Sequence, residues 1–176
     1  MKKIILFLLF VSLLAIVGCT IGENTTVKMS LKSGIDTVEI NSEYVDPGVK
    51  ATFGLLSLDV KVVSSTVNTQ MLGAYEIVYE ASYNGIFKTI TRIVTVIDDT
   101  APIIYLNPGV DTILIGENWV DAGVTITDNS NVVIDPIITG EINNQVVGDY
   151  EIVYQAKDSS NNINQIIRIV HVIDNE

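Results

Sequence analysis

The sequence predicts an all-β protein in which two tandem copies of one β-sandwich module follow an export signal. The nine residues GAYEIVYEA at positions 73–81 return as GDYEIVYQA at positions 148–156. Apolar and polar residues alternate along both strings, which is the pattern of a strand with one buried face. The closing strings of the two copies, RIVTVID at 92–98 and RIVHVID at 168–174, are rich in β-branched residues that favour strands.

The repeat runs in order along most of the chain and divides it into two domains. The nine-residue strings begin 75 residues apart, and the same offset relates VDPGV at 45–49 to VDAGV at 120–124. We therefore predict one domain over residues 27–98 and a second over residues 99–176. Pro102 restricts the residue before it to extended conformations, so the link between the domains should be short and stiff. Two copies favour two separate cores over a solenoid, in which three or more units share one core.

One turn of the repeat retains its glycine but not its proline. Pro47 of the first copy is replaced by Ala122 in the second, whereas Gly48 and Gly123 correspond. A type II turn needs a φ of about −60° at its second position, which alanine adopts, and a positive φ at its third, which favours glycine. The comparison predicts the same turn in both copies.

The first 19 residues resemble the export signal of a bacterial lipoprotein. Two lysines precede an apolar run over residues 4–17, which is shorter than the roughly 20 residues that span a bilayer. The run leads into Ile-Val-Gly-Cys, which resembles a lipobox. The resemblance implies that residues 1–18 are a signal peptide, that Cys19 carries fatty acids such as palmitate, and that residues 19–26 form a lipidated tether. An uncleaved anchor helix with an inert cysteine is the alternative.

Two or more acyl chains anchor a protein stably to a membrane. We therefore expect the protein on the extracytoplasmic face of the cell membrane, at the cell surface, with membrane lipid as a partner through Cys19. The chain is acidic, with 10 Lys+Arg against 21 Asp+Glu and a formal net charge of −11. Such a charge repels phosphate backbones, so nucleic acid is excluded as an expected partner. With one cysteine in the chain, no intramolecular disulfide can form.

The string Gly-x-Tyr-x-Ile-x-Tyr resembles strand F of an immunoglobulin-type sandwich, in which a tyrosine near the strand start hydrogen-bonds to a nearby backbone group. The resemblance places Tyr75 and Tyr150 in this tyrosine-corner role. Ile77 and Ile152 then stand where antibody domains carry a disulfide cysteine, so apolar packing must hold each module together.

The second copy also resembles tandem Ig-like modules of bacterial surface proteins, the DUF5011 or group-3 type. The matching segments are DTAPII at 99–104, GENWVDAGV at 116–124 and VGDY at 147–150. Asn161 stands where the family has glycine, and in the first copy Phe53 replaces the equivalent of the family aspartate Asp128. The resemblance implies two tandem Ig-like sandwiches that serve as spacers or as adhesive and binding units, without catalysis.

Catalytic patterns are weak in this sequence. The single histidine, His171, lies in a predicted strand with no cysteine partner and no serine motif nearby. No GxSxG, HExxH or phosphate-binding glycine loop is present in the sequence. We predict that the protein is not an enzyme and uses no cofactor.

Repeat edges and loops carry aspartates that could approach one another. Calcium needs six to eight oxygen ligands, and clustered loop carboxylates supply them. Turn and capping roles are the favoured interpretation, so no metal site is predicted. The weaker calcium candidates are Asp98, Asp99, Asp121, Asp128 and Asp158.

Three aromatic residues are candidates for ligand contact. Trp119 occupies the repeat position of Tyr44, and an exposed ring there would stack on a sugar, whereas a buried ring would fill the core. Correspondence in both copies favours the core. Tyr83 and Phe87 have no aromatic equivalents in the second copy and are candidates for a contact surface.

These features lead to two functional hypotheses. The first is a non-catalytic surface lipoprotein whose tandem modules act in display, spacing or adhesion to protein or glycan. The alternative is an accessory lipoprotein that captures carbohydrate or another substrate for an uptake or degradative system.

Overall fold

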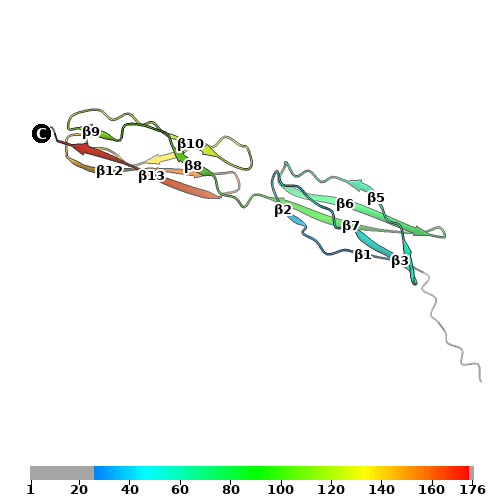
Figure 1. Ribbon diagram of the computed structural model, residues 1–176. Coiled ribbons are helices and arrows are strands. Elements are labelled where there is room, and N and C mark those ends of the chain that lie inside the picture. Colours follow the sequence, from blue (N-terminus) through cyan, green and yellow to red (C-terminus); the bar gives the residue numbers. More distant parts are fainter. Residues whose placement is uncertain (1–25, 175–176) are drawn as a thin grey trace, which may run out of the picture.

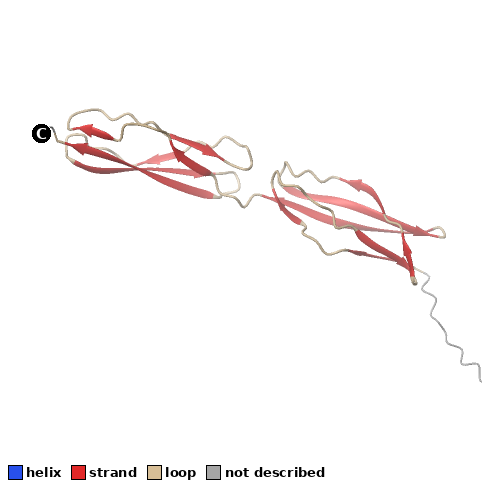
Figure 2. Ribbon diagram, in the orientation of Figure 1, coloured by secondary structure: helices blue, strands red, loops and turns tan. Residues whose placement is uncertain are grey.

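The computed structural model describes residues 26–174, and in this range it contains thirteen strands and no helix (Figures 1 and 2). No sheet combines strands that precede residue 98 with strands that follow it. The structure confirms the prediction of an all-β chain with two tandem sandwiches. The predicted signal peptide, Cys19 and all but the last residue of the predicted tether lie outside the described residues. Within residues 26–174, no helix is long and apolar enough to cross a membrane.

The first module packs a four-stranded sheet, in the order β2-β7-β6-β5, against a three-stranded sheet in the order β1-β3-β4. The last two strands form the long central hairpin, and β2 runs parallel to β7, whereas the other neighbours are antiparallel. The strands are β1 (Val27–Leu31), β2 (Thr37–Glu39), β3 (Val49–Phe53), β4 (Leu56–Leu58), β5 (Lys61–Ser65), β6 (Gly73–Tyr83) and β7 (Ile86–Ile97).

The second module repeats this plan with one strand fewer. Its four-stranded sheet has the order β11-β12-β13-β9, again with a parallel pair at β9 and β13, and its second sheet pairs β8 with β10. The strands are β8 (Ile103–Leu106), β9 (Thr112–Leu114), β10 (Val124–Thr127), β11 (Ile137–Thr139), β12 (Gly148–Lys157) and β13 (Ile163–Ile173).

Alternating side chains of the central hairpins form both cores. In β6, Ile77, Tyr79 and Ala81 are buried, and in β12 the equivalent residues are Ile152, Tyr154 and Ala156. Their partner strands contribute alternating buried valines, Val94 and Val96 in β7 and Val170 and Val172 in β13. A period of two residues per face is the geometry of a pleated strand, so the alternation read from the sequence places the correct face inward.

Left-handed backbone positions explain two features of the repeat. Gly48 and Gly123 have φ angles of 75° and 70°, and each donates its N–H to the preceding Asp46 or Asp121 carboxylate. The predicted need for glycine at the third turn position is therefore confirmed. Asn161, which departs from the family glycine, also has a φ of 75°. Asparagine tolerates this region better than other residues with a Cβ atom, so the turn is kept.

The modules differ at the end of the strand that precedes this loop. In the first module β3 continues through Gly54 into the short strand β4, and the ring of Phe53 lies 4.6 Å, centre to centre, from that of Tyr83. In the second module, residues 128–131 form a polar loop, and no strand equivalent to β4 follows. Asp128 and Asp158 occupy the positions of the two aromatic residues, at the same 75-residue offset.

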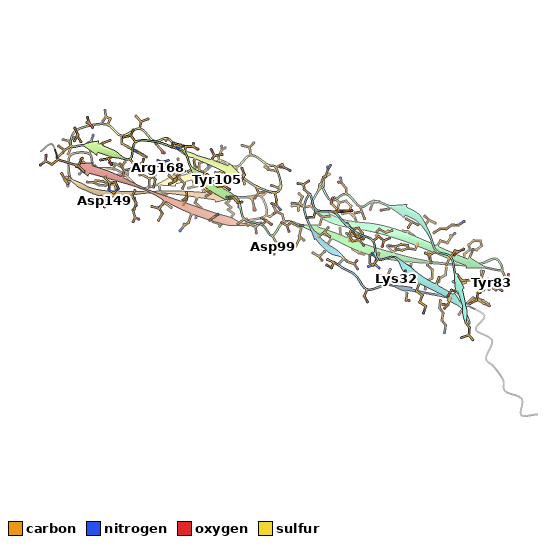
Figure 3. The ribbon with its side chains drawn as sticks, in the orientation of Figure 1. Lys32, Tyr83, Asp99, Tyr105, Asp149 and Arg168 are labelled. Carbon is orange, nitrogen blue, oxygen red and sulfur yellow. The ribbon has the colours of Figure 1, made fainter. Side chains whose placement is uncertain are left out.

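The two modules lie end to end, so the described chain enters at one end of the pair and leaves at the other (Figure 1). Residues 98–102 connect them without a strand. Figure 3 shows Asp99 at this joint, and Tyr83 at the end of the first module that lies away from it.

Candidate functional site

Each module contains one buried arginine that connects the two sheets. Arg92 and Arg168, the only arginines in the sequence, are 1% and 2% exposed. The Arg168 Nη1 atom donates to both oxygens of Asp111 at 2.8 and 2.9 Å, and Nη2 donates to two backbone carbonyls (Figure 3). Arg92 makes the same contacts with Asp36 and two carbonyls of its own module. A planar guanidinium suits this two-oxygen geometry, and lysine cannot replace it.

A buried tyrosine completes each arginine network. The Tyr79 hydroxyl donates to Asp46 at 2.6 Å, and the Tyr154 hydroxyl donates to Asp121. Burial, together with these carboxylate acceptors, raises the pKa of Tyr79 and of Tyr154 to about 12. The networks fix the turn that carries Asp46 or Asp121 to the core, so their role is structural.

The tyrosine networks predict a late alkaline transition. Both phenols are protonated in the fold up to a pKa of about 12, against about 10 in an unfolded chain. Their stabilising contribution should therefore be complete below about pH 10 and be lost as the pH rises toward 12. An ultraviolet titration should show these two of the seven tyrosines ionising last, and Tyr79→Phe with Tyr154→Phe should remove the late phase. Ionisation of every tyrosine near pH 10 in the folded chain would contradict this expectation.

The structure gives Tyr75 and Tyr150 the hydrogen bonds of a tyrosine corner. The Tyr75 hydroxyl donates to the Met71 carbonyl at 2.7 Å, and the Tyr150 hydroxyl donates to the Val146 carbonyl at 2.9 Å. Both acceptors lie four residues upstream, which is the contact that characterises this feature of Ig sandwiches. Each bond ties the loop before the central hairpin to the hairpin itself.

Polar contacts hold the joint between the modules. Glu39 of the first module accepts hydrogen bonds from the Asp99 N–H, the Thr100 hydroxyl and the Asn129 side chain. Burial alone would raise the pKa of Glu39, but these donors hold it below the ordinary value. Asn41 donates to the Asn129 backbone carbonyl at 2.7 Å. The loop at 128–131 is therefore attached to the first module as well as to its own.

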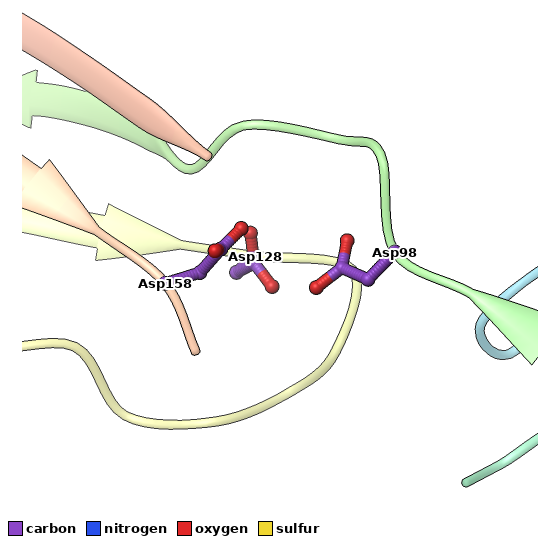
Figure 4. Close-up of side chains that lie close together, drawn as sticks. All are labelled: Asp98, Asp128 and Asp158. Carbon is purple, nitrogen blue, oxygen red and sulfur yellow. The ribbon is translucent and has the colours of Figure 1, made fainter. Parts of the chain in front are cut away.

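Three of the five candidate calcium aspartates meet at this joint. Each of Asp98, Asp128 and Asp158 offers a carboxylate oxygen, and these oxygens all lie within 4.8 Å of one another. Figure 4 shows the three carboxylates directed toward one another from separate segments of the chain. Burial, together with the negative charges of Asp158 and Asp128, raises the pKa of Asp98. Asp99 and Asp121 are not part of the cluster.

The aromatic candidates have different surroundings. Trp119 is partly buried against the core of the second module, and its indole Nε1 donates to the Val110 carbonyl at 3.0 Å. Tyr44 packs against the first core in the same way. Tyr83 lies in the apolar cluster that includes Phe53, whereas Phe87 is 65% exposed.

A shallow open hollow borders Trp119. Polar side chains line it beside the ring, so it combines an aromatic face with hydrogen-bonding groups. The lining residues are Asn118, Trp119, Asp121, Ile138, Gly140, Glu141, Ile142, Asn144 and Ile152.

His171 lies on the outer face of β13, opposite Asp149 on β12. Its Nδ1 atom is 2.6 Å from an Asp149 carboxylate oxygen, and both side chains are largely exposed. The pair is a cross-strand contact of the kind that stabilises sheets.

Sequence reasoning missed the two arginines and Glu39. The arginines had a detectable signal, because each falls on the face of its strand that also carries two core valines, and each stands at the same repeat position. Glu39 had none, because its partners follow 60 or more residues later and meet it only in the assembled joint.

The chain belongs to the family described as bacterial surface protein, Ig-like domain, which matches residues 33–96 and again residues 110–172. A solved lipoprotein from Bacteroides thetaiotaomicron is similar over 83% of this chain and 80% of its own, with 16% identity and a TM-score of 0.33. No curated protein matches the chain.

Proposed function

We propose that the protein is a lipid-anchored, non-catalytic surface protein whose two modules act in display, spacing or adhesion. The observation that supports this proposal is the end-to-end arrangement, with the tether entering one end of the pair and the chain leaving at the other (Figure 1). Cys19 precedes the first described residue by only seven positions. An anchor there would hold the first module near the membrane and carry the second module outward.

The partners follow from this placement. Membrane lipid holds the protein through Cys19, and a surface protein or a glycan meets the outward module. The formal net charge of −11 disfavours nucleic acid and anionic lipid headgroups as ligands of the modules. The membrane association therefore depends on the acyl chains rather than on the sandwich surfaces.

Replacing the proposed lipidation residue tests the anchor. Cys19→Ala should move the protein out of the membrane fraction and abolish incorporation of a labelled palmitate analogue, because stable anchoring needs two or more acyl chains. Thr20→Ala is the matched control, since it leaves the cysteine and the preceding residues unchanged. Protease added to intact cells should degrade the wild-type modules if they face outward. A Cys19→Ala protein that stays in the membrane fraction would refute the lipid anchor.

The hollow beside Trp119 favours glycan capture as the second candidate function. An aromatic ring flanked by carboxylate and amide groups is suited to stacking on a sugar and hydrogen-bonding its hydroxyls. Because Trp119 also packs on the core, its removal would confuse binding with folding. Glu141, which lines the hollow and is exposed, is the better substitution. Saturable binding of the wild type on a glycan array, lost in Glu141→Ala with an unchanged melting temperature, would support capture over spacing.

A further inference from the structure

We propose that Asp98, Asp128 and Asp158 form a calcium site at the joint between the two modules. Asp98 follows the last strand of the first module, Asp128 follows β10, and Asp158 follows β12. Their carboxylate oxygens lie within 4.8 Å of one another, although the residues are 30 to 60 positions apart in the sequence (Figure 4).

The charges of this cluster have no protein counter-charge. Asp98 and Asp158 are 9% and 6% exposed, so water screens them poorly. No Lys, Arg or His side chain in residues 26–174 forms an ion pair with any of the three aspartates. Buried carboxylates without a cationic partner oppose folding unless they bind a proton or a cation.

A separate observation indicates an unfilled ligand position. The Oδ2 atom of Asp128 is buried from solvent and accepts no hydrogen bond, and the same holds for Oδ1 of the adjacent Asn129. Buried side-chain oxygens almost always have a partner, so an orphaned carboxylate oxygen suggests an ion at that place. Asn129 Nδ2 is bound to Glu39, which leaves its oxygen as the remaining group of that side chain.

The first module shows how the same place in the fold closes without charge. There Phe53 and Tyr83 take the positions of Asp128 and Asp158, and their rings pack together at 4.6 Å. An apolar pair fills this end of the sandwich at no electrostatic cost. The second module instead presents two facing carboxylates, and the linker adds a third, which is unfavourable for packing and suitable for a cation.

Calcium matches the donor set best. It takes six to eight oxygen ligands in flexible geometry, whereas magnesium demands a near-ideal octahedron and retains its waters. Three carboxylates carry six oxygens. Nearby donors already orient them, with Ser160 on Asp98, Ser130 on Asp128 and the Asn162 side chain on Asp158. Each carboxylate oxygen has two lone pairs, so these bonds can remain when an ion is bound.

Occupancy would fasten the modules to each other. Asp98 belongs to the exit of the first module, whereas Asp128 and Asp158 belong to loops of the second. An ion held by all three therefore adds a cross-link to the contacts that Glu39 and Asn41 make with the 128–131 loop. The joint becomes stiffer when calcium is bound.

The test uses the full chain in neutral detergent, stripped of metal with a chelator and then titrated with calcium chloride. Calorimetry should show one calcium ion per chain, with a dissociation constant between about 10⁻⁵ and 10⁻³ M. At saturation the melting temperature of the second module should rise by about 5 °C or more, because the ion binds only the folded state. Asp128→Asn should weaken binding at least tenfold, without lowering the melting temperature in chelator, since it removes a buried charge and keeps an acceptor for Ser130.

Asp135→Asn is the matched control, because it removes one exposed carboxylate from the same module, outside the cluster, and it should bind calcium as the wild type does. Asp98→Asn is the second cluster variant and should also lose binding. The absence of binding heat up to about 10 mM calcium would overturn the proposal. An equal calcium response in Asp128→Asn and Asp135→Asn, or an equal response of the wild type to magnesium, would overturn it as well.

Discussion

Arg168→Met should lower the free energy of unfolding of the second module by about 3–5 kcal/mol, the usual cost of removing one partner from a buried ion pair. The substitution retains apolar volume but leaves the Asp111 carboxylate and the carbonyls of Asn107 and Gly123 without their donor. A module of this size has roughly 4–11 kcal/mol in total. Calorimetry should therefore show the transition of the second module far below its wild-type temperature.

Two variants make this result specific to the buried network. Lys157→Met removes a positive charge from an exposed site on β12 of the same module and should change its stability by less than about 0.5 kcal/mol. Arg92→Met should move the transition of the first module instead. If Arg168→Met and Lys157→Met had equal effects, the guanidinium would not be the element that joins the two sheets.

Gly140→Ala should destabilise the second module by roughly 2–4 kcal/mol. Gly140 follows the edge strand β11 and has a φ of 109°, and a Cβ atom there would lie 2.2 Å from the Glu151 carbonyl oxygen. That carbonyl belongs to β12, at the centre of the sheet, and cannot move aside easily. The edge strand must shift instead, so amide exchange should accelerate at Ile137–Thr139 and the melting temperature should fall.

Gly116→Ala separates the steric effect from the backbone effect. Gly116 has a φ of 85°, but a Cβ atom there would meet nothing within 4 Å. Its replacement should therefore cost only the conformational penalty of about 1–2 kcal/mol. If both alanine variants were equally stable, the contact with Glu151 would carry no weight.

The architecture was readable from the sequence because the repeat reports the backbone twice. Gly48 and Gly123 mark a position where only the φ angle is preserved, and the structure confirms that angle in both copies. The alternation along residues 73–81 and 148–156 identifies the inward face, since side chains of a strand alternate by geometry alone.

The joint was not readable, for a physical reason. Asp128 and Asp158 are ordinary loop residues until the second module folds, and Asp98 reaches them only because the linker turns as it leaves the first module. Sequence reasoning therefore assembled five candidate acids, of which Asp99 and Asp121 have other surroundings. Arg92 and Arg168 were overlooked because a charged residue in a strand normally indicates the solvent face.

The parallel pairing of β2 with β7, and of β9 with β13, determines how the molecule responds to tension. Within each module the chain enters along one of these strands and leaves along the other, and backbone bonds such as Thr95 N–H to Asp36 and His171 N–H to Asp111 join the pair. Traction between the two chain ends pulls the strands of a pair past each other, so these bonds are strained together rather than opened one by one. Tethered on one side and gripped on the other, the protein is constructed to resist drag.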